Sequence, residues 1–131
     1  MIEQASNKVN TKQKRNEIFI DPSYSVYNND NLFNLADLTL NRDNQLLPLH
    51  RLRERLNSQG ENIHTADYLF QSGSRDKQGD YYSLGLLDKY HKISQEGLAR
   101  LVAFVIMEPP VVAPHLYAAL PDLTAAFEHV Y

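Results

Sequence analysis

The sequence predicts an α/β domain whose Rossmann-like parallel sheet is flanked by helices. Two observations lead to this fold class. Short apolar segments of strand composition alternate with segments of helical periodicity, which is the pattern of βαβ units. The segment RLVAFVIM at 100–107 is apolar from Leu101 onward, as in a strand that is buried on both faces. A chain of 131 residues fits one ordinary domain.

The composition is that of a globular protein, with 43% hydrophobic and 22% charged residues. A net charge of −3 gives no general attraction to nucleic acid or to anionic lipid. The chain has no cysteine, which excludes disulfides and thiolate chemistry. No apolar run approaches the roughly 18 residues of a membrane span, and the start lacks the apolar core of a signal peptide. The sequence therefore predicts a cytoplasmic protein without an integral membrane segment.

The first strand follows a polar N-terminal segment. We expect residues 1–16 to be a disordered tail, although their four basic residues would also suit a nucleic-acid-binding arm. EIFID at 17–21 is the predicted strand, because Pro22 cannot continue it. The Asn-rich segment 22–44 has no sustained period, and irregular segments of that length are often functional.

A helix is predicted within residues 41–63. Asp43 or Asn44 can cap its N-terminus, Pro48 suits the first turn, and Gly60 closes the C-terminus. Leucines three and four positions apart form the apolar face that the period of an α-helix requires. These residues are Leu49, Leu52 and Leu56.

The remaining elements are shorter. Strands are predicted at 61–67 and 81–87, with a loop between them. His64 in the first of these suits a half-exposed strand residue better than a metal ligand, because no second ligand stands at metal spacing. SQEGLAR offers a short helix capped by Ser94. One or two helices that begin at Pro114 then precede a last strand at the end of the chain.

Common catalytic motifs are absent from the sequence. No GxGxxG or Walker pattern can be drawn through the five glycines, and neither GxSxG nor HExxH occurs. These residues alone therefore do not predict a self-contained nucleotide-driven enzyme.

Glu108 is the candidate catalytic residue. It follows the most apolar predicted strand and precedes Pro109 and Pro110, which fix the direction of the backbone. In open parallel sheets, ligands bind in the crevice beyond the carboxyl ends of the strands. A carboxylate beside apolar walls at that place suits a general base or acid. The alternative, that Glu108 caps the next helix or pairs with a lysine, has equal weight from the residues alone.

The segment FVIMEPPVVAPHLYAALPDLTAAFEHVY, residues 104–131, resembles the fucosyltransferase-like glycosyltransferases of glycosyltransferase family 10. In that family a strand ends in Glu, Ser-Pro or Pro-Pro follows, and a short helix leads to a Phe-x-x-x-Tyr strand. Upstream, FIDPSYS at 19–25 and the segment from LFNLADL to NSQG at 32–60 are similar to the opening of bacterial members. The resemblance covers about residues 17–131.

The resemblance implies two facing Rossmann-like domains, the GT-B architecture, with the glycan acceptor held mainly by the first. It also implies an inverting, metal-independent transfer of fucose from GDP-fucose to a glycan hydroxyl. The general base of that reaction maps to Glu108. We therefore expect residues 17–131 to be the N-terminal, acceptor-side domain of such an enzyme, possessing no cofactor or metal site of its own.

Two departures from the family limit this interpretation. The donor signature of the family, a Glu-Asn-Ser run followed by Tyr-x-Thr-Glu-Lys, does not occur in this sequence. Because the chain stops as a strand begins, we expect it to be part of a longer enzyme whose C-terminal donor domain is missing. The isolated chain is accordingly predicted to be inactive. In addition, Pro109 stands where many members carry Ser.

Acceptor contacts are predicted from chemistry, since sugars bind to aromatic faces and to polar side chains that donate and accept hydrogen bonds. The candidates in segments that would border the cleft are Tyr24, Asn41, Arg42 and His115. Loop anchoring and helix capping are the alternatives for these residues. A non-catalytic α/β module that binds another protein remains the alternative function for the whole chain.

Overall fold

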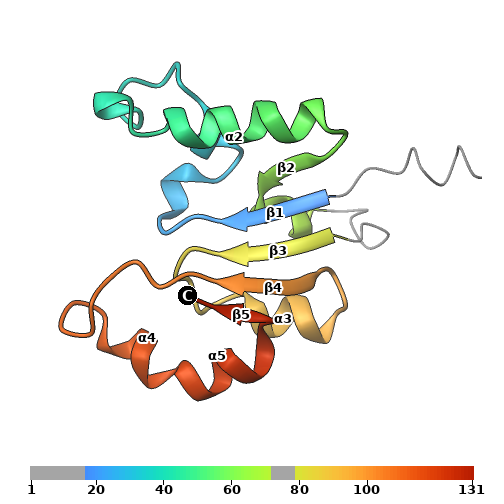
Figure 1. Cartoon of the computed structure of the whole chain (residues 1–131), viewed down its shortest axis with the longest axis vertical. Coiled ribbons are helices and arrows are strands. Elements are labelled where there is room, and N and C mark those ends of the chain that lie inside the picture. The colour runs from blue at the N-terminus through green and yellow to red at the C-terminus, as the bar shows by residue number, and fades with distance from the viewer. Residues whose placement is uncertain (1–16, 72–78) are drawn as a thin grey trace, which may run out of the picture.

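The computed structural model describes residues 17–71 and 79–131. Its centre is a five-stranded, all-parallel sheet in the order β2-β1-β3-β4-β5 (Figure 1). The predicted α/β class with a helix-flanked parallel sheet is confirmed. The predicted N-terminal tail lies outside the described residues, as does most of the loop before β3. The strands are β1 Glu17–Asp21, β2 Asn62–Thr65, β3 Gly79–Ser83, β4 Arg100–Phe104 and β5 His129–Val130.

Helices connect these strands, and several of them are short. The α-helices are α2 Leu47–Ser58, α3 Tyr90–Gln95, α4 Pro114–Ala118 and α5 Leu120–Ala126. The 3-10 helices are η1 Ser25–Tyr27, η2 Asn31–Phe33, η3 Arg42–Asn44 and η4 Ala66–Phe70.

Four boundaries differ from the sequence prediction. The strand predicted at 81–87 begins earlier and ends at Ser83, so residues 84–87 form a loop. The strand predicted at 100–107 ends at Phe104. Ser94 lies inside α3 and does not cap a later helix, and Gly97 with a φ of 64° follows that helix. The predictions for β1, β2, β5 and the helix start at Pro114 are confirmed within one or two residues.

The fourth difference is the start of α2. Asp43 and Asn44 have left-handed φ values of 56° and 60°, in a turn that precedes the helix. The N–H of Leu46, the residue before α2, instead donates a 2.9 Å hydrogen bond to the Oδ1 of Asn41. Asn41 therefore satisfies a backbone donor at the helix start, a role that the sequence predicted for Asp43 or Asn44.

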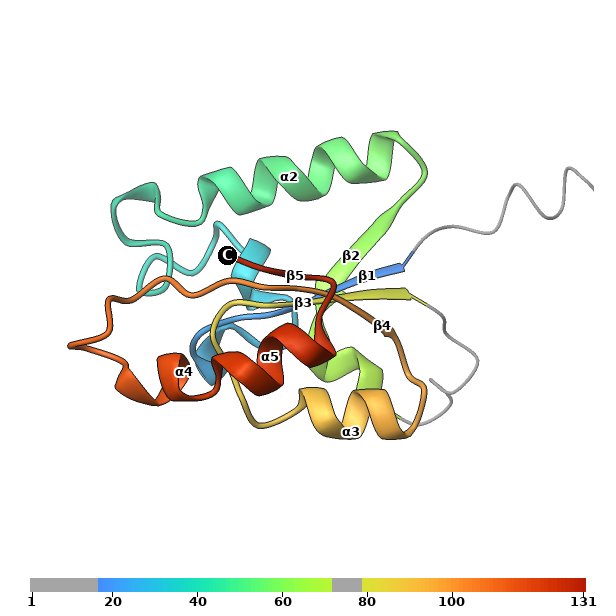
Figure 2. The ribbon, with the colours of Figure 1, turned by 60° about the horizontal axis from the view of Figure 1, so that its bottom comes forward.

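The sheet has a switch point between β1 and β3. The chain passes from β1 outward to β2, returns past β1 to β3, and then continues outward through β4 to β5. Right-handed crossovers then place α2 on one face and the later helices on the other. Figure 2 shows α2 on one side of the sheet and α3, α4 and α5 on the opposite side.

Two hydrophobic clusters correspond to the two faces. Neighbouring residues of a strand point to opposite faces, so Phe19 joins the cluster under α3 to α5 and Ile20 joins the cluster under α2. In the larger cluster, the ring of Phe127 lies 5.5 Å from Phe104 and 6.1 Å from Tyr81, measured between centroids. This packing fixes the strands whose carboxyl ends carry the candidate site.

Candidate functional site

Glu108 lies beyond the carboxyl end of β4 rather than directly at it. After Phe104, the N–H of Val105 donates to the carbonyl of Ser83 and the N–H of Ile106 donates to that of Tyr131, both at 2.8 Å. The chain then leaves the sheet, and the Glu108 side chain is exposed. The apolar walls expected around this carboxylate are therefore not supplied by the described residues of this chain.

The backbone around Glu108 is held in place. The Tyr117 hydroxyl donates a 2.8 Å hydrogen bond to the carbonyl oxygen of Glu108. The N–H groups of Val112 and Ala113 both donate to the carbonyl of Pro109 at 3.0 Å. The loop between β4 and α4 is thus a closed turn that α4 braces from one side.

The carboxylate itself is free. Within residues 17–71 and 79–131, it makes no ion pair and no side-chain hydrogen bond. The residue that caps α4 is Ala113, and no side chain caps that helix. Neither alternative role for Glu108, helix cap or partner of a lysine, is seen in this part of the chain.

Exposed apolar residues flank Glu108 in the sequence. Met107 is 62% exposed, Val111 87% and Val112 61%. Tyr24 and Val26, in the loop after β1, are exposed as well. Loops that follow parallel strands lie at the same edge of the sheet, here called the carboxyl edge (Figure 1). Exposed apolar side chains gathered at one edge are typical of a surface that contacts a ligand or a second domain.

Asp21 occupies the switch point, and sequence analysis did not identify it as a functional residue. Its carboxylate is fully buried and accepts a 2.5 Å hydrogen bond from the Tyr81 hydroxyl. The ammonium of Lys89 lies 3.3 Å from its Oδ1. The Ser23 hydroxyl donates to the carbonyl of Leu84 at 2.8 Å nearby. These contacts join the ends of β1 and β3 to the loop that leads into α3.

The buried position also alters the chemistry of Asp21. Burial disfavours the charged form and raises the pKa of the Asp21 carboxyl, although the Tyr81 hydrogen bond and Lys89 oppose that shift. Since no surface of Asp21 is exposed, it supports the edge of the sheet rather than contacting a solute. The sequence did show an acid, Asp21, at the end of a strand and directly before a proline. Its partner Lys89 is remote in the chain, so the sequence alone did not indicate that the two residues meet.

A second acid, Asp30, anchors the Asn-rich loop. Its carboxylate accepts hydrogen bonds from the Thr65 N–H at 2.9 Å and from Arg53 at 3.0 Å. The Nδ1 of His64 lies 2.8 Å from the same carboxylate. Burial opposes ionisation here, but the contacts with His64, Thr65 and Arg53 hold the pKa of Asp30 below its usual value. The loop is therefore fixed to β2 and α2 by a structural cluster.

The four predicted acceptor residues belong to different segments: Tyr24 and Asn41 lie between β1 and α2, Arg42 begins η3, and His115 lies in α4. Tyr24 is 67% exposed, and Arg42 and His115 are also exposed. Asn41 is buried, and its side-chain amide donates to the carbonyl of Leu35 and to Asn44. No hydrogen bond or ion pair between described residues joins the side chain of any of the four to Glu108. Their role in acceptor binding stays a prediction.

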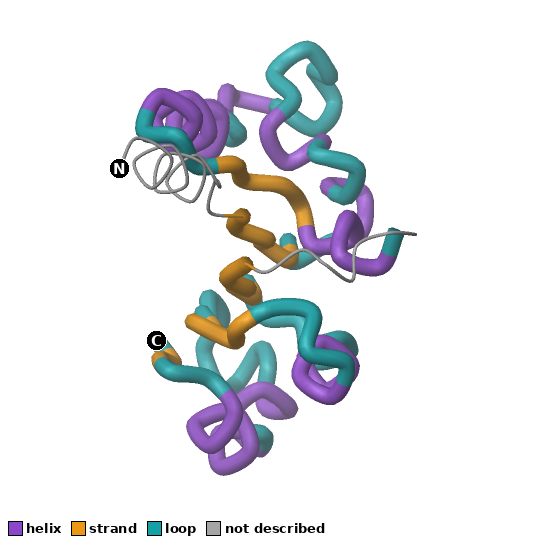
Figure 3. Tube along the Cα trace, turned by 90° about the vertical axis from the view of Figure 1, so that its right-hand side faces the viewer, coloured by secondary structure: helices purple, strands orange, loops and turns teal. Residues whose placement is uncertain are grey.

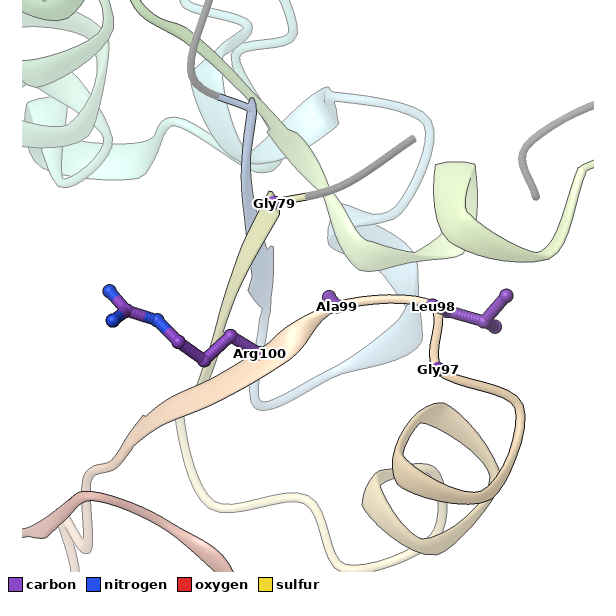
Figure 4. Close-up of a pocket in the computed structure, with 5 residues that line it drawn as sticks. All are labelled: Gly79, Gly97, Leu98, Ala99 and Arg100. Carbon is purple, nitrogen blue, oxygen red and sulfur yellow. The ribbon is translucent and has the colours of Figure 1, made fainter. Parts of the chain in front are cut away.

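A hollow of about 250 Å³ lies at the opposite edge, beside the amino ends of β3 and β4. Figure 4 shows Leu98 and Arg100 pointing in opposite directions from the chain that borders it. Among the described residues of its lining, Arg100 is the one charged side chain, and it already pairs with Asp80 and Glu128. These residues therefore offer no free charged group that could act on a substrate.

Neither a metal-binding cluster nor a membrane-spanning helix occurs in the described part of the chain. No group of three or more His, Cys, Asp or Glu side chains in it could hold a metal ion. None of its helices has the length and apolar character needed to cross a bilayer.

Comparisons with known proteins do not extend this description. No protein-family model, no curated protein and no solved structure matches the chain. A functional assignment must therefore follow from the residues and geometry of the carboxyl edge.

Proposed function

We propose that this chain is the acceptor-side domain of an inverting, GT-B type glycosyltransferase that transfers fucose from GDP-fucose to a glycan hydroxyl, with Glu108 as general base. The observation that carries the proposal is the state of Glu108. It is an exposed carboxylate with no partner among the described residues, on a braced turn at the edge where parallel α/β sheets bind their ligands. The resemblance of residues 104–131 to fucosyltransferase-like enzymes supports the same role.

The proposed reaction uses one carboxylate on the acceptor side. Glu108 takes the proton of the acceptor hydroxyl as the oxygen attacks the anomeric carbon of fucose. The new glycosidic C–O bond forms on the face opposite the departing GDP, so the configuration inverts. The donor domain of the longer enzyme would bind GDP-fucose and close the site over Glu108, which would supply the apolar surroundings that the described residues do not provide.

The exposed apolar residues beside Glu108 fit this arrangement. Met107, Val111 and Val112 would lie against the donor domain or the acceptor when the site closes. The bracing of the turn by Tyr117 would keep the carboxylate at one position, which a general base within hydrogen-bonding reach of its substrate requires.

The test is the change Glu108→Gln in the enzyme formed by this domain and its donor domain. The variant keeps the shape of the side chain but cannot accept a proton, so we expect kcat to fall by about a hundredfold or more while acceptor affinity is kept. Glu96→Gln, an exposed acid at the end of α3, is the matched control and should leave kcat unchanged. Near-normal turnover by Glu108→Gln would end this assignment.

The isolated chain allows a second check. It should bind free oligosaccharides weakly, with NMR shift changes in the loops around Glu108 and Tyr24, but should not transfer fucose from GDP-fucose. Fucose transfer by the 131-residue chain alone would contradict the division into acceptor and donor domains.

A protein-binding module is the second candidate function. The observation that favours it is the exposure of Met107, Val111 and Val112, which would equally suit contact with a separate protein. A stable protein partner whose binding is abolished by Val111→Asp, together with no change on adding oligosaccharides, would support this candidate over the enzyme.

A further inference from the structure

The face of the sheet that carries α2 is only partly covered. Neighbouring strands lie about 4.8 Å apart and a packed helix is about 10 Å wide, so one helix covers about two strands. α2 packs over β2 and shares a hydrophobic cluster with Ile18 and Ile20 of β1, whereas α3, α4 and α5 lie on the other face. Figure 3 shows that, among the described residues, no helix stands beside α2 over β4 and β5 on this face.

The open part of this face is an apolar groove. It has a volume of about 250 Å³ and runs between one flank of α2 and the sheet. On the α2 side the groove is lined by Leu52, which is 40% exposed, and Leu56. The residues that form its floor in the sheet include Tyr82, Leu84 and Val105.

The far rim of the face carries an aromatic pair. Ala103 of β4 pairs with His129 of β5, and Tyr82 of β3 pairs with Ala103, so the three side chains point to the same face. The rings of His129 and Tyr131 stack at 5.9 Å, and Tyr131 is 70% exposed. The open face therefore continues beyond the groove across the width of a second helix.

The near rim of the groove is positively charged. Arg51 and Arg55 are exposed one turn apart on α2 and border the same flank as Leu52. Neither makes an ion pair with a described residue. Arg53, on the other flank of the helix, is paired with Asp30. The two free guanidinium groups thus stand at the side where an occupant of the groove would lie.

We propose that this face docks an amphipathic α-helix of a partner protein, with its apolar stripe on Tyr82, Leu84 and Val105 and with acidic residues facing Arg51 and Arg55. By the strand and helix spacings given above, β3, β4 and β5 leave room for one helix beside α2, and the apolar floor requires an apolar stripe. The unpaired arginines select acidic residues along the adjacent flank of that helix. The inference is independent of the proposed transferase activity, because Glu108 belongs to the carboxyl edge.

The experiment uses two labelled synthetic helical peptides of about 18 residues, long enough for stable helicity. Both carry the same leucine and alanine stripe, and one has glutamates along its flank where the other has lysines. Fluorescence anisotropy with the purified chain should show saturable binding and an affinity about three- to tenfold higher for the glutamate peptide. The double change Arg51→Glu with Arg55→Glu should reverse that preference.

Two further variants separate the contributions. Leu52→Glu should weaken both peptides, because it places a charge in the apolar groove. Lys92→Glu, an exposed cation on α3 at the opposite face of the sheet, should change neither affinity. Circular dichroism of each variant confirms that it remains folded.

Other outcomes would overturn the proposal. Equal affinity for the two peptides, unchanged by the Arg51 and Arg55 reversals, would show that charge does not select the occupant. Absence of saturable binding would exclude a helix-docking face. A dimer by light scattering that Leu52→Glu converts to a monomer would show that a second copy of the chain occupies the face instead.

Discussion

The hydroxyl of Tyr81 and the buried carboxylate of Asp21 form a 2.5 Å hydrogen bond between the middle of β3 and the end of β1. Burial and the charge of Asp21 raise the pKa of the Tyr81 hydroxyl, so it remains a donor across the physiological range. The contact joins the two strands that flank the switch point, and it holds in place the loops that extend from them.

Removal of that hydroxyl should destabilise the fold. In Tyr81→Phe the buried carboxylate loses its closest partner, so we expect the free energy of unfolding to fall by about 1–3 kcal/mol. Urea denaturation measures the change. The adjacent variant Tyr82→Phe is the matched control, because that hydroxyl makes no hydrogen bond with a described residue and its loss should change stability by less than about 0.5 kcal/mol. Equal losses in both variants would assign the effect to something other than the bond to Asp21.

Asp21 should also give stability a specific dependence on pH. Burial raises the pKa of Asp21 in the folded chain above the ordinary value of 3.8. At pH values between 3.8 and this higher folded-state pKa, the folded chain therefore binds more protons than the unfolded chain. Stability contributed by this group therefore falls as the pH rises through that interval. Asp21→Asn removes the contribution, so the stability of the variant relative to the original chain should improve as the pH rises above 3.8. If the difference in unfolding free energy between Asp21→Asn and the original chain does not vary with pH, Asp21 does not titrate with a raised pKa in the folded chain.

Asp30 should show the opposite dependence. Although burial acts against ionisation, its contacts with His64, Thr65 and Arg53 lower its pKa below 3.8. The stability it contributes is present above that value and is lost as the pH falls through the lower, folded-state pKa. Asp30→Asn should therefore lose about 1–3 kcal/mol near neutral pH, with a smaller loss in acid.

The control for Asp30 is Asp43→Asn. Both acids have left-handed φ values, 61° for Asp30 and 56° for Asp43, and asparagine tolerates that conformation. The side chain of Asp43 makes no hydrogen bond or ion pair with a described residue. Thermal unfolding at several pH values should show an effect at Asp30 and almost none at Asp43.

Gly79 at the start of β3 should not accept a side chain. A Cβ atom there would lie 2.9 Å from the Phe19 ring and would clash with the Glu17 carbonyl oxygen, which belongs to the backbone of β1. The clash can be relieved only if the two strands separate, so Gly79→Ala should destabilise the domain by about 2–4 kcal/mol. Equilibrium denaturation or soluble yield would measure this.

Gly97→Ala provides the comparison. Gly97 has a φ of 64° and no atom within 4 Å of a new Cβ, so only backbone strain opposes the change. We expect a loss of about 1 kcal/mol. A Gly79→Ala variant no less stable than Gly97→Ala would mean that β1 and β3 do not approach as closely as described.

Local signals in the sequence predicted much of the fold. Pro22 ends β1, Pro114 begins α4, and Gly60 with a φ of 84° follows the end of α2, each through a property of its own backbone. The strand ending at Phe104 was predicted too long, because Val105 and Ile106 are apolar and still pair with neighbouring chain although the strand has ended. Composition cannot distinguish residues inside a strand from apolar residues that hydrogen-bond to the neighbouring chain just beyond its end.

Long-range contacts could not be predicted in this way. Lys89 reaches Asp21, and Arg53 and His64 reach Asp30, only because the topology brings separate segments together. The same holds for Glu108, whose place after an apolar strand was evident while its exposure was not. Exposure depends on which residues cover a loop, and this information is spread over the whole chain.

The position of β1 between β2 and β3 has a consequence for synthesis of the protein. β1 is the first described strand to leave the ribosome, but its partners are Asn62–Thr65 and Gly79–Ser83. Until those segments emerge, the apolar side chains of Phe19 and Ile20 have no sheet to join. Pairings between such distant segments also slow folding. We therefore expect nascent chains to be most dependent on chaperones in the interval before Ser83 becomes available.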